Sequence, residues 1–529
     1  MIRIITSLVA VLTITSVQAQ TTVRETPKLV IGITVDQLRG DYLELFRNTF
    51  TERGFKRLLN EGLVYQNIKF DFPYLDDASA IAAIYTGAPP FYNGIVGNNK
   101  YSVPTKQIVP TFSDPAFLGN YTQDKVSPLA IKTSTITDEL KIASNGNSDV
   151  YSFAPNIAQA LITTGIRGNG AFWVDDYTGK WASSTFYSTF YWSVDQDNRS
   201  GADFSALAWD MWWSPLLNSD DYKAFPSIQG ADKIFNHNTG TDKQTYITAK
   251  KTPTVNENVR KTATKLLEKA ELGKRTSPDF LSLTFYAGNY PKASDYSIEI
   301  QDIYARLDRE IEKLLDDVDK TVGLKNTLIF LTSTGYYDSK DTEYKTDTNI
   351  PEKIFYINRC EALLNMYLMA IYGRDNQWVD KFYNGQVYLN RKLIEDKNLS
   401  LQEIQNKAAE FVSEFSGVQE VYTSYQIQHG QWNPVMEYYK NGYTRETSGD
   451  LFVELQPGYH IVDEQDKTVE KKQVRNNAVV CPVIFFGNNI KPERIKRTIK
   501  ATEIAPTVTY IMRIRSPNAA KEDPLPELL

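Results

Sequence analysis

The chain has 529 residues and a formal net charge of −6 at pH 7, with 42% hydrophobic and 23% charged residues. This profile is typical of a globular protein and excludes a disordered, collagenous or coiled-coil chain. Because the charge is mildly acidic and no block of Lys or Arg occurs, we expect no nucleic-acid partner. Only three His and two Cys are present, which limits any metal chemistry that depends on these ligands.

The N-terminus has the pattern of a secretory signal peptide. Arg3 precedes a short apolar run that ends at Val17-Gln18-Ala19, and polar residues follow. The run is shorter than the ~20 apolar residues of a membrane-spanning helix. We therefore expect residues 1–19 to be cleaved, the mature chain to be periplasmic or secreted, and no membrane span. No Cys follows the run, so we do not expect a lipoprotein.

Predicted strands and helices alternate along much of the chain. Residues 29–37 are almost wholly apolar and contain Asp36 near their end, which predicts a buried parallel strand that delivers a carboxylate to the ligand-binding edge of a sheet. Further strands are predicted at 65–72, 279–289, 326–335 and 479–487, and helices at 54–62, 76–87, 256–273, 297–323 and 501–514. This alternation predicts an α/β fold with a central, mostly parallel sheet sandwiched by helices.

Two stretches interrupt the alternation, at about 100–250 and 340–460. The first is rich in Trp, Tyr, Ser and Asn, and the second has its own short helices and strands. We interpret both as cap insertions in a single domain that spans residues 20–529. The aromatic side chains indicate either close packing within the cap or a ligand groove. Cys360 and Cys481 either form one disulfide or are two buried thiols.

Several segments resemble the alkaline phosphatase superfamily. They lie in order from residue 29 to residue 513 and include VIGITVDQLRGDYL, GFKRLLNEGLVYQN, IYTGAPPFYNGIVGNN, AFWVDDYTGKWASSTFY, GDLFVELQPGY and PVIFFG. The resemblance is greatest to secreted, phosphate-irrepressible bacterial alkaline phosphatases with a Thr nucleophile. It implies their α/β fold and a site in which carboxylates and imidazoles hold two Zn²⁺ ions beside the nucleophile.

The resemblance assigns the catalytic positions one by one. Asp36 stands at the first zinc-ligand position, and Asp77 stands where the family has its nucleophilic Thr. Four further ligand positions, which carry Asp or His in the family, fall on Ala287, Pro291, Thr334 and Gly335. The resemblance therefore implies a zinc site that has largely been lost.

The phosphate-positioning residues can be assigned in the same way. The family's Asn is matched by Asn98, whereas its Lys-x-Arg pair falls on Asn156 and Ala158. The last His ligand falls near Lys471 or Lys472, and no His occurs after residue 460. Because Asn156 and Ala158 replace the Lys-x-Arg pair, cationic stabilisation of a transition state would be absent there.

Other interpretations of these residues remain open. Asp36 is also explained as a strand-end carboxylate, and Asp76 and Asp77 as helix caps. Together the three carboxylates could bind Mg²⁺ or Ca²⁺ through oxygen ligands alone. Ser79 is the nearest hydroxyl, but no metal or His is positioned to activate it. No Gly-x-Ser-x-Gly turn accompanies the three histidines, His237, His429 and His460, so a catalytic triad is not indicated.

We therefore interpret the chain as a pseudophosphatase, an exported binding or scaffold component that needs no cofactor and has a protein partner in the cell envelope. One alternative is a phosphatase or phosphodiesterase that uses Zn²⁺ or Mg²⁺ at Asp36 and Asp77. Another is a module that binds phosphate or sulfate esters through Asn98.

Overall fold

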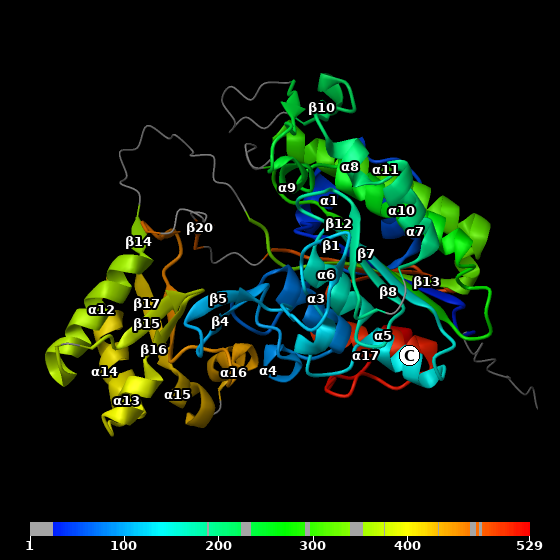
Figure 1. Cartoon of the computed structure of the whole chain (residues 1–529). Helices are drawn as coiled ribbons and strands as arrows, with labels where there is room; N and C mark the ends of the chain where they lie inside the picture. The colour runs from blue at the N-terminus through cyan, green and yellow to red at the C-terminus, as the bar shows by residue number, and fades with distance from the viewer. Residues whose placement is uncertain are drawn as a thin grey trace, which may run out of the picture.

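A ten-stranded sheet forms the centre of the molecule (Figure 1). The computed structural model describes residues 25–187, 190–223, 234–290, 297–338, 353–374, 376–431, 433–465, 472–474 and 479–529. The strands follow the order β22-β2-β21-β13-β1-β12-β7-β8-β9-β6. They are β1 (Leu29–Asp36), β2 (Leu63–Tyr65), β6 (Gly119–Asn120), β7 (Val150–Ala154), β8 (Gly170–Val174), β9 (Trp181–Ser184), β12 (Asp279–Tyr286), β13 (Thr327–Ser333), β21 (Val483–Gly487) and β22 (Glu493–Ile495).

Strand β1 lies in the middle of this sheet and pairs in parallel with β12 on one side and β13 on the other. All its residues are buried, as expected for a parallel strand that is covered on both faces. The parallel order continues from β12 to β7 and β8, whereas β21 and β9 run antiparallel to their neighbours. The predicted α/β fold with a mostly parallel sheet is therefore confirmed.

Helices cover both faces of the sheet. Alternate residues of β1 point to opposite sides, so each face carries apolar side chains that pack against a layer of helices. One face packs against α1 (Gly40–Leu45), α2 (Phe55–Glu61), α7 (Trp192–Ser200), α8 (Phe204–Ala208), α10 (Thr254–Lys269) and α11 (Ile298–Thr321). The other packs against α3 (Asp77–Thr86), α5 (Ile136–Ala143), α6 (Ile157–Thr164) and α17 (Ile504–Met512). Figure 1 shows these two helical layers on either side of the strands.

A second lobe lies beside the central sheet (Figure 1). Its antiparallel sheet has the order β15-β16-β18-β17 and packs with three helices around its own apolar cluster. These elements are β15 (Val379–Tyr383), β16 (Gln386–Leu389), β17 (Val418–Thr423), β18 (Leu451–Leu455), α12 (Ile357–Tyr372), α13 (Arg391–Asp396) and α14 (Leu401–Ser413). Tyr101 of the hairpin β4 (Asn99–Ser102) and β5 (Gln107–Pro110) contacts Tyr388, with ring centroids 4.3 Å apart.

The interpretation of residues 100–250 as a cap is wrong for β6, β7, β8 and β9, because these strands extend the central sheet. Strands β7 and β8 are wholly buried runs of five residues that continue the parallel pairing from β12. The strand predicted at 65–72 is also wrong in extent. The chain leaves the sheet after Tyr65, and β3 (Ile68–Lys69) pairs instead with β23 (Ile499–Lys500).

The two cysteines lie in different hydrophobic clusters. Cys360 packs in the second lobe, and Cys481 packs beside the central sheet. Both are buried free thiols in this structure. Of the two alternatives that the sequence left open, the structure therefore has two thiols rather than a disulfide.

Candidate functional site

Three neighbouring parallel strands bring the candidate residues to one edge of the sheet. Asp36 is the last residue of β1, Ala287 directly follows β12, and Thr334 directly follows β13. The strands are in register, and the backbone N–H of Ala287 donates to the backbone oxygen of Asp36 at 2.9 Å. The structure therefore places these sequence-assigned positions together at the edge where α/β proteins bind ligands.

The carboxylate of Asp36 is bound by two hydroxyl groups. Thr334 Oγ1 donates to Asp36 Oδ1 at 2.9 Å, and the hydroxyl of Tyr336 donates a second hydrogen bond. Asp36 is only 4% exposed. Burial and the negative charge of Asp77 raise the pKa of Asp36 well above its usual range, while the two hydroxyl donors act in the opposite direction.

Asp77 occupies the first turn of α3, directly after the capping residue. Asp76 caps the helix by accepting from the backbone N–H of Ser79 at 2.9 Å, and the Ser79 hydroxyl donates back to Asp76. Asp77 is 5% exposed, and Gln159 Nε2 donates to its Oδ2 at 2.8 Å. Burial and the charge of Asp76 raise the pKa of Asp77 to about 6, although hydrogen bonds from Asn98 and Gln159 lower it.

Asn98 hydrogen bonds to these carboxylates through both its backbone and its side chain. Its backbone N–H donates to Asp76 Oδ2 at 2.7 Å, and its Nδ2 donates to Asp76 Oδ2 and to Asp77 Oδ1. The amide that the resemblance assigns to phosphate positioning therefore binds two protein carboxylates. Nearby, Asn156 caps α6 and Ala158 is buried, so neither supplies a cation.

Gly335 stands in a crowded position with φ +78°. A Cβ atom there would collide with the ring of Phe70 and would contact Leu75 Cδ2 at 3.1 Å. The Phe70 ring therefore fills the space into which a side chain at position 335 would project. Ala287 is fully buried, and its methyl side chain has no atom that could bind a metal ion.

The remaining positions that the resemblance assigned as zinc ligands are Pro291 and Lys471 or Lys472. Pro291 and Lys471 lie outside the described residues, and Lys472 belongs to the short strand β20 (Lys472–Gln473). Among the described residues, no three His, Cys, Asp or Glu side chains cluster so that they could hold a metal ion. The three histidines lie in β11 (His237–Asn238), α15 (Ser424–His429) and β19 (His460–Val462).

Three residues that meet at this site were not identified from the sequence. Tyr336 and Gln159 donate to the two aspartates, and Phe70 fills the space beside Gly335. The position of Tyr336, two residues after Thr334 in TSTGY, was the only local signal for any of them. Tyr, Gln and Phe have no specific spacing pattern that marks such roles.

Together, the mostly parallel sheet and the position of the site at the carboxyl ends of β1, β12 and β13 define an α/β protein of the kind that binds ligands at this edge. A model of the family described as type I phosphodiesterase / nucleotide pyrophosphatase matches residues 30–478, and the chain belongs to this family within the alkaline phosphatase superfamily. The resemblance found in the sequence is thus confirmed at the level of the superfamily.

Individual relatives match over nearly their whole length. The chain is 28% identical to alkaline phosphatase PafA of Elizabethkingia meningoseptica, with 95% of this chain and 94% of that protein covered. It is 29% identical to a protein of Myroides odoratus named calcium-transporting ATPase, with 96% and 95% covered. The crystal structure of wild-type PafA aligns with a TM-score of 0.82 at 27% identity, covering 95% of this chain and 99% of that chain.

The raised pKa of Asp77 makes stability depend on pH. The folded pKa of about 6 exceeds the ordinary 3.8, so this group's stabilising contribution is complete below about pH 4 and lost as pH rises through about 6. We expect Asp77→Asn to reduce the loss of unfolding free energy between these pH values by about 2 to 3 kcal/mol. Urea unfolding at several pH values measures this, with Asp220→Asn, at an exposed position, as the control. An unchanged pH slope in Asp77→Asn would contradict the assignment.

The steric contact between Phe70 and position 335 can be tested by comparing the stability cost of an Ala substitution there with the cost at Gly146, a glycine with a similar φ. Gly335→Ala should cost well over ~1 kcal/mol, because it combines a left-handed backbone with a steric collision. Gly146→Ala has a similar φ of +83° but no neighbour within 4 Å, so it reports the backbone contribution alone. In a Phe70→Ala background we expect the cost of Gly335→Ala to fall toward that of Gly146→Ala in urea unfolding. Equal costs in both backgrounds would show that the ring does not fill this space.

Proposed function

We propose that this chain is an exported alkaline-phosphatase-like protein without phosphatase chemistry, which acts as a binding or scaffold component of the cell envelope. One observation carries the proposal. The two carboxylates at the candidate site are bound by uncharged donors of the protein itself, namely Thr334 and Tyr336 on Asp36, and Asn98 and Gln159 on Asp77. These hydrogen bonds occupy carboxylate oxygens that a metal ion would need as ligands, and they occupy the Asn98 amide that a phosphate group would need as a donor.

The described residues do not fit a pair of zinc ions. Ala287 and Gly335 offer no side-chain donor, and the hydroxyl of Thr334 is already committed to Asp36 and to the backbone N–H of Gln37. Zinc is bound by thiolate, imidazole and carboxylate groups, and structural or catalytic sites need at least three such ligands. The ring of Phe70 also fills the space beside Gly335.

Electrostatics also disfavour a phosphate ester at this site. Neither Asp36 nor Asp77 forms an ion pair with Lys or Arg within the part of the chain that is described. A phosphate dianion would therefore meet two buried carboxyl groups without a compensating cation. A carboxylate can act as a nucleophile, but Asn98 donates to Asp77 and is not available to hold the substrate. The structure thus gives no specific support to either the metal-dependent enzyme or the phosphate-binding module.

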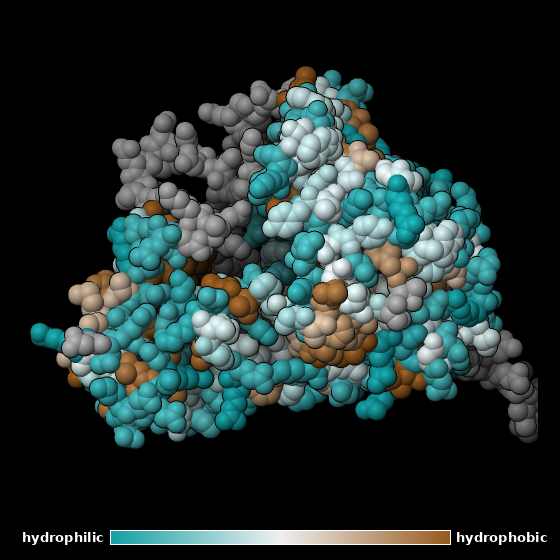
Figure 2. Space-filling model, in the orientation of Figure 1, coloured by the Kyte–Doolittle hydropathy of each residue, from teal (hydrophilic) through white to brown (hydrophobic). Residues whose placement is uncertain are grey.

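The aromatic region offers a surface for a protein partner. Trp173 and Trp181 are buried in the central sheet, whereas Trp192, Trp209 and Trp212 are at least half exposed. Figure 2 shows a largely hydrophilic face with separate hydrophobic patches. Exposed Trp side chains are typical anchors of protein interfaces. Close packing therefore accounts for Trp173 and Trp181, whereas the exposed Trp192, Trp209 and Trp212 support a contact surface for a partner rather than a ligand groove.

Export rests on the N-terminal pattern, because residues 1–19 lie outside the described residues. No helix in the described ranges is both long and apolar enough to cross a membrane.

Metal content and turnover test the loss of phosphatase chemistry. The mature protein is dialysed against micromolar Zn²⁺, analysed for zinc and assayed with an aryl phosphate monoester and an aryl phosphate diester. We expect no stoichiometric zinc and no chelator-sensitive turnover, because the ligand positions lack donors. About two zinc ions per chain would overturn the proposal. Turnover that Mg²⁺ or Zn²⁺ supports and Asp36→Ala removes would establish the metal-dependent alternative.

The scaffold part of the proposal is tested by photo-crosslinking in cells. A photoreactive amino acid at position 212 should give a discrete crosslinked protein in the envelope fraction, because Trp212 is an exposed aromatic side chain. The matched control carries the same group at position 510, where Tyr510 is exposed on α17 at the other side of the sheet. Identical products from both positions, or none from position 212, would contradict a partner at this surface.

A further inference from the structure

A cavity of about 500 Å³ lies away from the candidate site, where three distant segments of the chain meet. Its walls come from residues 131–143 with α5, from Ile166 and Arg167 after the end of α6, and from Arg515 and Asn518 after α17. The volume is within the range of small-molecule sites. Gln159 of α6 contacts Asp77 from the first turn of that helix, whereas the cavity adjoins its opposite end, so the two places are distinct.

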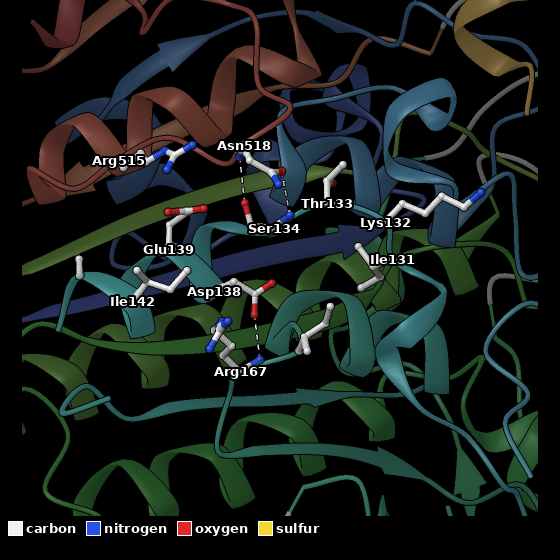
Figure 3. Close-up of a pocket in the computed structure, with 12 residues that line it drawn as sticks. Ile131, Lys132, Thr133, Ser134, Asp138, Glu139, Ile142, Arg167, Arg515 and Asn518 are labelled. Carbon is white, nitrogen blue, oxygen red and sulfur yellow. Dashed lines mark hydrogen bonds between the residues drawn. The ribbon is translucent and has the colours of Figure 1, made fainter. Parts of the chain in front are cut away.

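The cavity contains charged groups of both signs without protein partners. Glu139 is only 5% exposed, yet among the described residues no Lys, Arg or His pairs with its carboxylate. The guanidinium groups of Arg167 and Arg515, at exposed positions, likewise have no ion-pair partner in the described ranges. Figure 3 shows the side chains of Arg515 and Glu139 directed toward the same space beside Ser134 and Asn518. The Glu139 carboxylate lines the cavity and is not among the fully enclosed polar groups that lack a partner, so a cationic group that enters the cavity can pair with it.

The other acidic side chain of the cavity does not offer the same opportunity. Asp138 accepts hydrogen bonds from the backbone N–H groups of Thr135 and Arg167, at 3.0 and 2.8 Å, and from the Thr135 hydroxyl at 2.9 Å. Lys132 is paired outside the cavity with Glu446 at 2.8 Å. The free charges are therefore one carboxylate in the interior and two guanidinium groups at the rim.

The walls are held in place by reciprocal hydrogen bonds. The backbone N–H of Ser134 donates to Asn518 Oδ1 at 3.0 Å, and the backbone N–H of Asn518 donates to Ser134 Oγ at 2.9 Å. Figure 3 shows both bonds. The hydroxyl of Thr137 donates to the backbone oxygen of Thr164 at 3.0 Å and joins α5 to the end of α6. A cavity formed before the ligand arrives lowers the ordering cost of binding.

We infer that this cavity binds a zwitterionic amino acid or short peptide with an aliphatic side chain. Its ammonium group enters first and pairs with Glu139, and its carboxylate pairs with Arg515 and Arg167 at the rim. Ile131, Ile142 and Ile166 provide apolar wall for the aliphatic side chain. This inference does not depend on the proposed loss of phosphatase chemistry, because none of its residues belongs to the candidate site.

Calorimetric titration of the full mature chain with the dipeptide Ala-Leu and with leucine tests the assignment. At least one of the two should bind saturably in the micromolar to millimolar range. N-acetylation of the bound probe, which removes its ammonium group, should weaken binding at least ~10-fold in the wild type. The same modification should have little effect in Glu139→Gln, because the carboxylate that recognises the ammonium is gone.

Amidation of the probe's carboxylate should weaken binding to the wild type and have little effect in Arg515→Gln. Glu446→Gln serves as the matched control, since it removes a carboxylate that pairs with Lys132 but does not line the cavity. Circular dichroism and urea unfolding establish that each variant is folded. Absence of saturable binding by both probes, or equal sensitivity to acetylation in the wild type and Glu139→Gln, would overturn the inference.

Discussion

The parallel pairing of β1 between β12 and β13 is the constraint on which the candidate site depends. Because the three strands are in register, the residues at their carboxyl ends must meet whatever their chemical type. In this chain the same geometry brings together a carboxylate at Asp36, a methyl group at Ala287 and a hydroxyl at Thr334. The sheet determines where the candidate site lies, and the side chains at its edge decide what chemistry is available there.

Buried negative charge is then the problem that the surrounding residues must solve. A metalloenzyme compensates clustered carboxylates with metal cations, whereas here neutral hydroxyl and amide groups donate to Asp36 and Asp77. Neutral donors offset only part of the desolvation and repulsion, and the pKa of each carboxyl remains raised. The protonation of the site is therefore coupled to folding.

Helix α6 joins this edge to the cavity that is lined by Glu139, Arg167 and Arg515. Gln159, in its first turn, donates to Asp77, and the loop after its last residue carries Arg167 into the cavity wall. A helix of eight residues spans ~12 Å, so the two places are separated by one rigid element.

Local patterns determined much of what the sequence predicted. Apolar runs and helix caps are properties of neighbouring residues, so β1 with its terminal Asp36 and α3 with its Asp76 cap could be found from the sequence. The family resemblance, which extends along the chain, correctly implied the central sheet. The tertiary structure alone decided that Tyr336 donates to Asp36, since these residues are 300 positions apart. It also decided that Gln159 contacts Asp77 and that Phe70 fills the space beside Gly335, because such contacts depend on how distant segments pack and not on any local period or spacing.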